Sequence, residues 1–269
     1  HAGVSPRTLT TEAVAQRQDN QDADEADLRD SHHYRVLTQE SYVNARRALE
    51  KAVRDYPGHA LASAALGDLV ASGYLFGYDE DVYSLARAEA LGRKAVALDP
   101  DSQTGRFTLA LIHFLKFQRA LFLEEVERAL KLNPNNANMN AVISLHVVMV
   151  GDWDRAMKLM SKAMHLNPHH PGWYHIVAFM NYYRQGEYDL ALVEARRFNT
   201  PDFFWDPLIR AAVLGQLDRR SEAEKAADEL LALMPDFNLR GRSLIRRLAY
   251  LDEHVEILWD GLCKAGLGE

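Results

Sequence analysis

The chain has 269 residues, of which 48% are hydrophobic and 26% are charged, and its formal net charge is −7 at pH 7. This negative balance argues against nucleic-acid binding, which requires a basic face. No stretch approaches the ~18 consecutive apolar residues that a membrane-spanning helix needs. Cys263 is the single cysteine, which excludes a disulfide framework within one chain and leaves the compartment open between cytoplasm and periplasm, with the cytoplasm slightly favoured.

The N-terminal stretch, residues 1–26, is polar and acidic and has few apolar side chains to bury. We expect it to form a loosely attached arm. The chain starts without a methionine and without a signal-peptide pattern, so we expect a fragment cut from a longer protein. A basic counter-patch near the other end is interpreted, like the acidic arm, as a solvated face; it consists of Arg240, Arg242, Arg246 and Arg247.

A short phrase that ends in proline recurs along most of the chain. Successive prolines of this set are separated by 43, 34, 34, 33 and 34 residues, and they are Pro57, Pro100, Pro134, Pro168, Pro201 and Pro235. Each follows a helix-like stretch, which the proline would end because it lacks an N–H and restricts the preceding residue. A fixed period of this length indicates stacked helical hairpins.

Two turns within this period share one pattern. The stretches that begin at Gly151 and Gly186 each place a glycine, an aromatic residue and a small alanine at identical offsets. The glycine can take the left-handed conformation that ends a first helix. We expect the aromatic ring to cover the turn and the alanine, Ala156 or Ala191, to let two helices approach closely.

With these positions the chain resembles the tetratricopeptide repeat (TPR). In one repeat the family's positions are held by Ile143, Ser144, Gly151, Ala156, Ala163 and Pro168. Two departures are Phe198, where the family has alanine, and Asp218, where it has the turn glycine. The resemblance implies an all-α, right-handed superhelical solenoid of helix-turn-helix repeats. It also implies about five to six repeats over residues 27–237, the first degenerate and the second carrying an insertion placed at 73–84.

The C-terminal stretch, residues 238–269, lacks the repeat signature but keeps a helical period of apolar residues, as Leu244, Leu248 and Leu251 show. We expect two capping helices here, with a boundary around Asp252. The stretches 37–53, 166–174 and 260–267 also resemble the C-terminal repeat region of bacterial class III adenylate cyclases and winged-helix regulators. That resemblance implies a regulatory or interaction module attached to an effector domain.

In a TPR array the first helix of each pair lines the concave side, and the matching positions here are largely apolar. The candidate groove residues are Phe107, Leu111, Phe114, Leu145, Trp173, Ile176, Met180, Tyr183, Trp205 and Leu208. Three interpretations stay open: the capping helices or a tight superhelix bury this stripe, a peptide or partner helix binds it, or a small molecule binds it. Because the lining is apolar, we expect no cluster of basic residues that would hold a peptide carboxylate.

The sequence contains no catalytic motif, so we predict a non-enzyme without a cofactor. A cluster of His165, His169, His170 and His175 suggests zinc, but no cysteine or carboxylate stands at a supporting spacing, and we predict no metal site. His113 and His146 are interpreted as core or groove histidines.

The predicted function is a protein-interaction and regulatory scaffold with a protein or peptide partner. The alternative is a sensor for an apolar or amphiphilic small molecule, and self-association is compatible with either.

Overall fold

The structure is a computed structural model that describes residues 38–79, 81, 83–248 and 251–268. The predicted arm at 1–26 therefore lies outside the described residues. Within the described part every regular element is helical, which confirms the all-α prediction. The α-helices are α2 (Gln39–Asp55), α3 (Ala60–Phe76), α4 (Ser84–Leu98), α5 (Gln103–Leu115), α6 (Arg119–Leu132), α7 (Ala137–Met149), α8 (Trp153–Leu166), α9 (Ile176–Arg184), α10 (Tyr188–Phe198), α11 (Trp205–Gln216), α12 (Arg220–Leu233), α13 (Phe237–Leu248) and α14 (Asp252–Lys264), and a short 3-10 helix, η1 (Gly172–His175), precedes α9.

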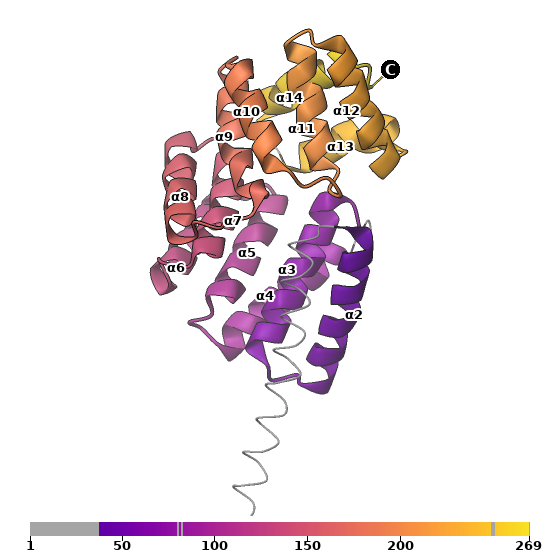
Figure 1. The fold of residues 1–269 in the computed structure, drawn as a ribbon. Helices are drawn as coiled ribbons and strands as arrows, with labels where there is room; N and C mark the ends of the chain where they lie inside the picture. Colours follow the sequence, from indigo (N-terminus) through magenta and orange to yellow (C-terminus); the bar gives the residue numbers. More distant parts are fainter. Residues whose placement is uncertain (1–37, 80, 82, 249–250, 269) are drawn as a thin grey trace, which may run out of the picture.

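The helices pair in sequence order and stack into a solenoid (Figure 1). The hairpins are α3–α4, α5–α6, α7–α8, α9–α10 and α11–α12, and α2 packs against α3 as the second helix of an incomplete first unit. Each proline of the recurring phrase follows the end of a second helix by two or three residues, as Pro134 does after α6. Small residues such as Ala88, Ala129 and Ala163 are fully buried where the helices approach, so the repeat period is also the period of the core.

The turns inside the hairpins use left-handed backbone, whatever residue is present. Gly151 and Gly186 have φ of 87° and 78°, as their pattern predicts. The equivalent turns after α5 and α11 place Phe117 and Asp218 in the same region, with φ of 57° and 54°. The hairpin therefore dictates the turn geometry. Glycine lowers the conformational cost of this geometry but is not required for it.

Helix α3 is longer than the equivalent first helices, with 17 residues against 13 in α5 and in α7. Its extra turn ends at Phe76, and Gly77 closes the helix with φ of 74°. This end reaches the far part of the array, because the Phe76 ring lies 5.3 Å from that of Phe203 in the α10–α11 connection. The two aromatic rings therefore join the end of α3 to the segment between the fourth and fifth hairpins.

Helices α13 and α14 fold back onto the array, α13 against α3 and α14 against α11 (Figure 1). Nη1 of Arg247 on α13 donates a hydrogen bond to the carbonyl oxygen of Tyr74 at 2.7 Å, and the guanidinium lies 4.7 Å from the centre of the Tyr74 ring. The expected basic patch is neutralised locally, since Arg242 and Arg246 pair with Glu256 and Asp252 at 2.5 and 2.6 Å.

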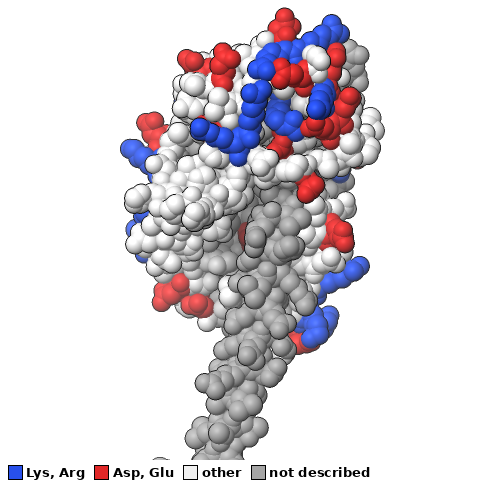
Figure 2. Space-filling model, in the orientation of Figure 1, with Lys and Arg blue, Asp and Glu red and all other residues white. Residues whose placement is uncertain are grey.

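Figure 2 shows blue and red side chains interspersed over the upper part of the molecule. No helix in the described ranges is long and apolar enough to cross a membrane.

Candidate binding cavity

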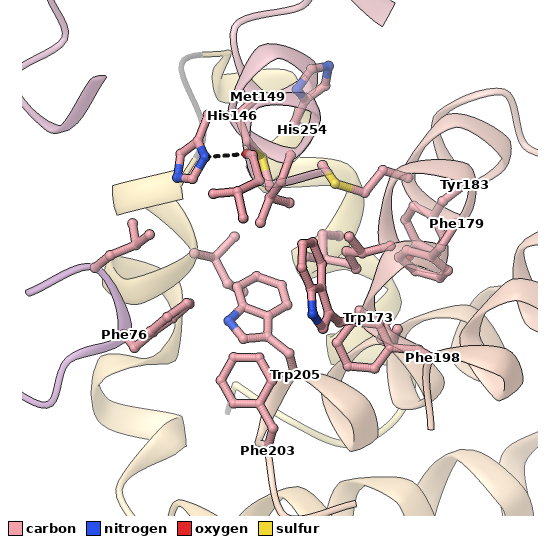
Figure 3. A pocket seen from close by; sticks show the side chains of 18 of the residues that line it. Phe76, His146, Met149, Trp173, Phe179, Tyr183, Phe198, Phe203, Trp205 and His254 are labelled. Carbon is pink, nitrogen blue, oxygen red and sulfur yellow. Dashed lines mark hydrogen bonds between the residues drawn. The ribbon is translucent and has the colours of Figure 1, made fainter. Parts of the chain in front are cut away.

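A cavity of about 140 Å³ lies on the concave side of the array (Figure 3). Its walls come from α3, α5, α7, the start of α8, the η1–α9 segment, the end of α10, the α10–α11 connection, α11, α13 and α14. Eight of the ten candidate groove residues line it: Phe107, Leu111, Leu145, Trp173, Ile176, Met180, Tyr183 and Trp205. The stacking of hairpins therefore brings together side chains that the sequence spreads over 99 positions.

The other two candidates, Phe114 and Leu208, lie away from the cavity. Both are buried, and the Phe114 ring packs 5.7 Å from that of Phe122 on α6, its partner in the same hairpin. The sequence pattern assigned Phe114 to the concave face, but near the end of α5 this position faces the inter-helix core.

The concave stripe is covered by the C-terminal helices rather than exposed as an open groove. Ile245 of α13 and His254, Ile257 and Leu258 of α14 form one wall of the cavity. Accordingly, only 3% of Phe107 and 4% of Tyr183 remain exposed to solvent. Of the three interpretations left open by the sequence, burial by the capping helices describes most of the stripe, and the cavity is what remains unfilled.

The position of α14 depends on very close contacts with α9 and α11. A Cβ placed on Gly261 would lie 2.2 Å from the Tyr183 hydroxyl oxygen and 2.5 Å from the carbonyl oxygen of Ala212. The Tyr183 hydroxyl lies within hydrogen-bonding distance of two carbonyl oxygens, at 3.3 Å from Ile257 on α14 and 3.4 Å from Ala212 on α11. Burial raises the pKa of Tyr183, so this group stays a neutral donor between the two helices.

One imidazole stands out in this apolar site. His146 on α7 is 4% exposed, and its ring lies edge-on to the rings of Phe107 and Phe114, at 5.7 and 5.0 Å. Its Nδ1 is 2.8 Å from the carbonyl oxygen of Val142. Burial lowers the pKa of His146 to about 4, although that hydrogen bond acts in the opposite direction. The imidazole is therefore neutral at physiological pH.

Other polar groups sit at the edges of the cavity. The guanidinium of Arg184 lies 4.2 Å from the centre of the Trp153 ring, and the His254 ring meets the same indole edge-on at 5.1 Å. Burial lowers the pKa of His254 as well. Asp68 and Ser72 of α3 contribute two more buried polar side chains to the lining.

The lining of the cavity is almost entirely apolar, so a ligand that enters it would bury apolar surface, at roughly 25 cal/mol per Å² removed from water.

Several lining residues were not apparent from the sequence. Phe76 and Phe203 come from a helix end and a connection, which repeat positions do not cover, and Phe198 is the last residue of α10. An aromatic residue in place of the family's alanine, at Phe198, was the one signal that could have indicated its role.

The histidine cluster near η1 does not assemble a metal site. The rings of His170 and His175 are 5.3 Å apart, and Nδ1 of His175 lies 2.7 Å from a carboxylate oxygen of Glu194. Among the residues that the structure describes, no group of three or more His, Cys, Asp or Glu side chains is arranged to hold a metal ion.

Comparison with known proteins finds no matching family model and no matching curated sequence. Solved structures do match. The type IV pilus biogenesis factor PilW is 17% identical with a TM-score of 0.52, over 74% of this chain and 90% of that one. A tetratricopeptide repeat protein from Parabacteroides merdae is 14% identical with a TM-score of 0.50, over 91% and 99%. TTC0263, a TPR protein of Thermus thermophilus, is 18% identical with a TM-score of 0.50, over 71% and 92%.

The fold is that of a TPR solenoid. At these identities the likeness establishes the architecture alone. The narrower resemblance to the repeat regions of adenylate cyclases and winged-helix regulators stays a prediction.

Proposed function

We propose that the chain is a non-catalytic protein-interaction scaffold whose concave face binds an amphipathic helix of a partner protein. The observation that supports this is α14, an amphipathic helix of the chain itself, which lies against that face with Val255 and Leu262 fully buried. Binding of an amphipathic helix in an apolar groove is a recurring mode of peptide recognition. In this proposal α14 is an internal ligand that a partner helix replaces.

A partner helix must compete with a tethered one. Because α14 is joined to the array by a short connection, its effective concentration at the groove is on the order of millimolar. Variants that weaken the docking of α14 should therefore strengthen partner binding. Gly261→Ala is suited to this purpose, because the added methyl group would overlap the Tyr183 hydroxyl and the Ala212 carbonyl.

The test uses a fluorescent peptide with the sequence of residues 251–268, with Ser in place of Cys263, added to the full chain. We expect weak binding to the wild type and binding at least about tenfold tighter to the Gly261→Ala protein, because overpacking of this kind costs about 1–3 kcal/mol. Gly58→Ala is the matched control, since a Cβ there meets nothing within 4 Å. If the peptide shows saturable binding to none of the three proteins, the helix-binding function is overturned.

We also propose that the scaffold is the regulatory part of a larger bacterial signalling protein. The support is the resemblance of three of its sequence stretches to the repeat regions of cyclases and winged-helix regulators. Sequencing the parent gene upstream of the codon for His1 tests this. We expect an in-frame cyclase or winged-helix domain, and a start codon or an export signal at that point would contradict the proposal.

A second candidate function is a small-molecule sensor, and the cavity is the observation that favours it. One of its walls belongs to α13 and α14. A ligand that fills the cavity would therefore add contacts between these helices and the array and would stabilise the closed arrangement. Ligand binding and partner-helix binding would then oppose each other.

A further inference from the structure

The cavity has the size and lining of a site for a small aromatic ring. An apolar cavity of about 150 Å³ in another protein stays dry and binds benzene, and the present one has about 140 Å³. Its walls include the rings of Phe76, Trp173, Phe179 and Trp205 (Figure 3). Edge-to-face and offset contacts with such rings favour an aromatic guest over an aliphatic one of equal size.

His146 contributes a buried imidazole to the lining of this apolar space. A carbonyl oxygen can only accept a hydrogen bond, so the short contact to Val142 means that Nδ1 carries the proton. In the neutral ring Nε2 is then an acceptor. This atom is buried and has no hydrogen-bonding partner among the described residues. A buried acceptor left in this state is costly, and a ligand with a donor would satisfy it.

The lining of the cavity disfavours a charged ligand, because it is apolar apart from a few polar side chains. Arg184 is already engaged, since it stacks on Trp153 and donates a hydrogen bond to Asn181 at 2.9 Å. A charged group of either sign would also lose its hydration on entering this apolar site.

We propose that the cavity binds a small neutral molecule built on a single aromatic ring, whose one O–H or N–H group donates a hydrogen bond to Nε2 of His146. The proposal rests on the sensor function and names its ligand class. Its test uses the full chain without added peptide, so failure of the peptide assay and failure of this test are separate outcomes.

Phenol and toluene are the probes that test it. They have nearly the same shape, and only phenol carries a donor. Binding of each to the full chain is measured by isothermal titration calorimetry, with the wild type, His146→Leu and His169→Gln. His169 is exposed on the loop before η1 and serves as the control position.

We expect 1:1 binding of both probes to the wild type. Replacing His146 by leucine should shift the ratio of the two dissociation constants toward toluene by about tenfold or more, because the phenol hydroxyl would then be buried without a partner. The His169→Gln protein should keep the wild-type ratio. If neither probe binds the wild type, the cavity is not a ligand site. If the ratio is the same in wild type and His146→Leu, the hydrogen bond to His146 is not formed.

A second measurement keeps the test independent of the folding of the variant. In the wild-type protein, the ¹⁵N resonance of His146 Nε2 should move when phenol is added and stay in place when toluene is added. Equal movement with both probes would overturn the assigned hydrogen bond even if His146→Leu fails to fold.

Discussion

Gly215 on α11 and Gly261 on α14 approach each other so closely that neither position has room for a side chain. A Cβ placed on Gly215 would lie 2.2 Å from the carbonyl oxygen of Gly261, a distance that real Cβ atoms essentially never show. Both residues are buried within regular helices, where glycine is otherwise unfavourable. The pair therefore fixes the depth at which α14 sits in the concave face.

The first prediction concerns this glycine pair. Gly215→Ala should lower the free energy of unfolding by about 1–2 kcal/mol, because overpacking of 1–3 kcal/mol outweighs the better helix propensity of alanine. Equilibrium urea denaturation measures the change, and Gly58→Ala is the control with open space around the added methyl group. Equal losses in the two variants would show that the close approach of α11 and α14 contributes nothing specific.

The second prediction concerns the contact that holds α13 against α3. Arg247→Met removes the hydrogen bond to the Tyr74 carbonyl and the stacking on its ring. We expect a loss of about 1–2 kcal/mol, since a charged hydrogen bond and a cation–π contact each contribute on that order. Amide hydrogen exchange should become faster in α13 and stay unchanged in α7.

Arg246→Met is the matched control for that variant, because it changes the neighbouring arginine. Arg246 pairs with Asp252 in an exposed ion pair, with 55% and 73% of the two side chains accessible. Such pairs contribute little, so this variant should exchange like the wild type. Faster exchange in α13 of both variants would assign the effect to loss of charge rather than to the Tyr74 contact.

The fold could be predicted from the repeat period, but the contacts between distant repeats could not. Ala156 and Ala191 recur because small residues are needed where two helices of a hairpin meet, and that requirement is local. The cavity depends instead on contacts between distant segments, such as Phe76 with Phe203 and Arg247 with Tyr74. No local pattern encodes those contacts, because they depend on the curvature of the whole array. Leu208 was predicted to line the groove, but it is buried in the core and does not line the cavity. The repeat pattern alone could not show this, because the lining also depends on the curvature of the whole array.

The third prediction concerns a buried carboxylate at the loop after α3. The Asp79 side chain accepts hydrogen bonds from Arg46 at 2.6 Å and from the Tyr42 hydroxyl at 3.2 Å. Burial alone would raise the pKa of Asp79. Hydrogen bonds from the Asp81 N–H, from Ser84 and from Tyr42, together with the charge of Arg46, outweigh it and hold the pKa below its ordinary value. The carboxylate thus contributes stability above its unfolded pKa, and this contribution is lost as the pH falls through the lower folded value.

Asp79→Asn should therefore lower the free energy of unfolding at pH 7 by about 1–3 kcal/mol, because it removes the charged hydrogen bond to Arg46, which keeps only its ion pair with Glu50. The difference from the wild type should shrink as the pH falls through the range in which Asp79 is protonated. Urea denaturation at a series of pH values measures both effects. Asp202→Asn is the control, since that side chain is exposed in the connection between α10 and α11. A difference that does not vary with pH would argue against an ionised Asp79 in the folded state.

The fourth prediction follows from the neutral state of His146. An unfolded histidine has a pKa near 6.5, and burial lowers the folded value to about 4. Between these values the unfolded chain binds a proton that the folded chain does not. The contribution of His146 is therefore complete above pH ~6.5 and is lost as the pH falls toward 4. The loss over this interval is on the order of 3 kcal/mol. His254, whose pKa burial also lowers, acts in the same direction.

The measurement is the free energy of unfolding of wild type and His146→Leu between pH 7 and pH 4. The wild type should lose more stability than the variant over this interval, and His169→Gln should follow the wild type. Saturating phenol should enlarge the loss of wild-type stability between pH 7 and pH 4 without changing its direction. The reason is that the ligand requires an unprotonated Nε2 and so stabilises the neutral ring further. Identical pH profiles for wild type and His146→Leu would mean that the imidazole titrates alike in the folded and unfolded chains, which is incompatible with its burial against Phe107 and Phe114.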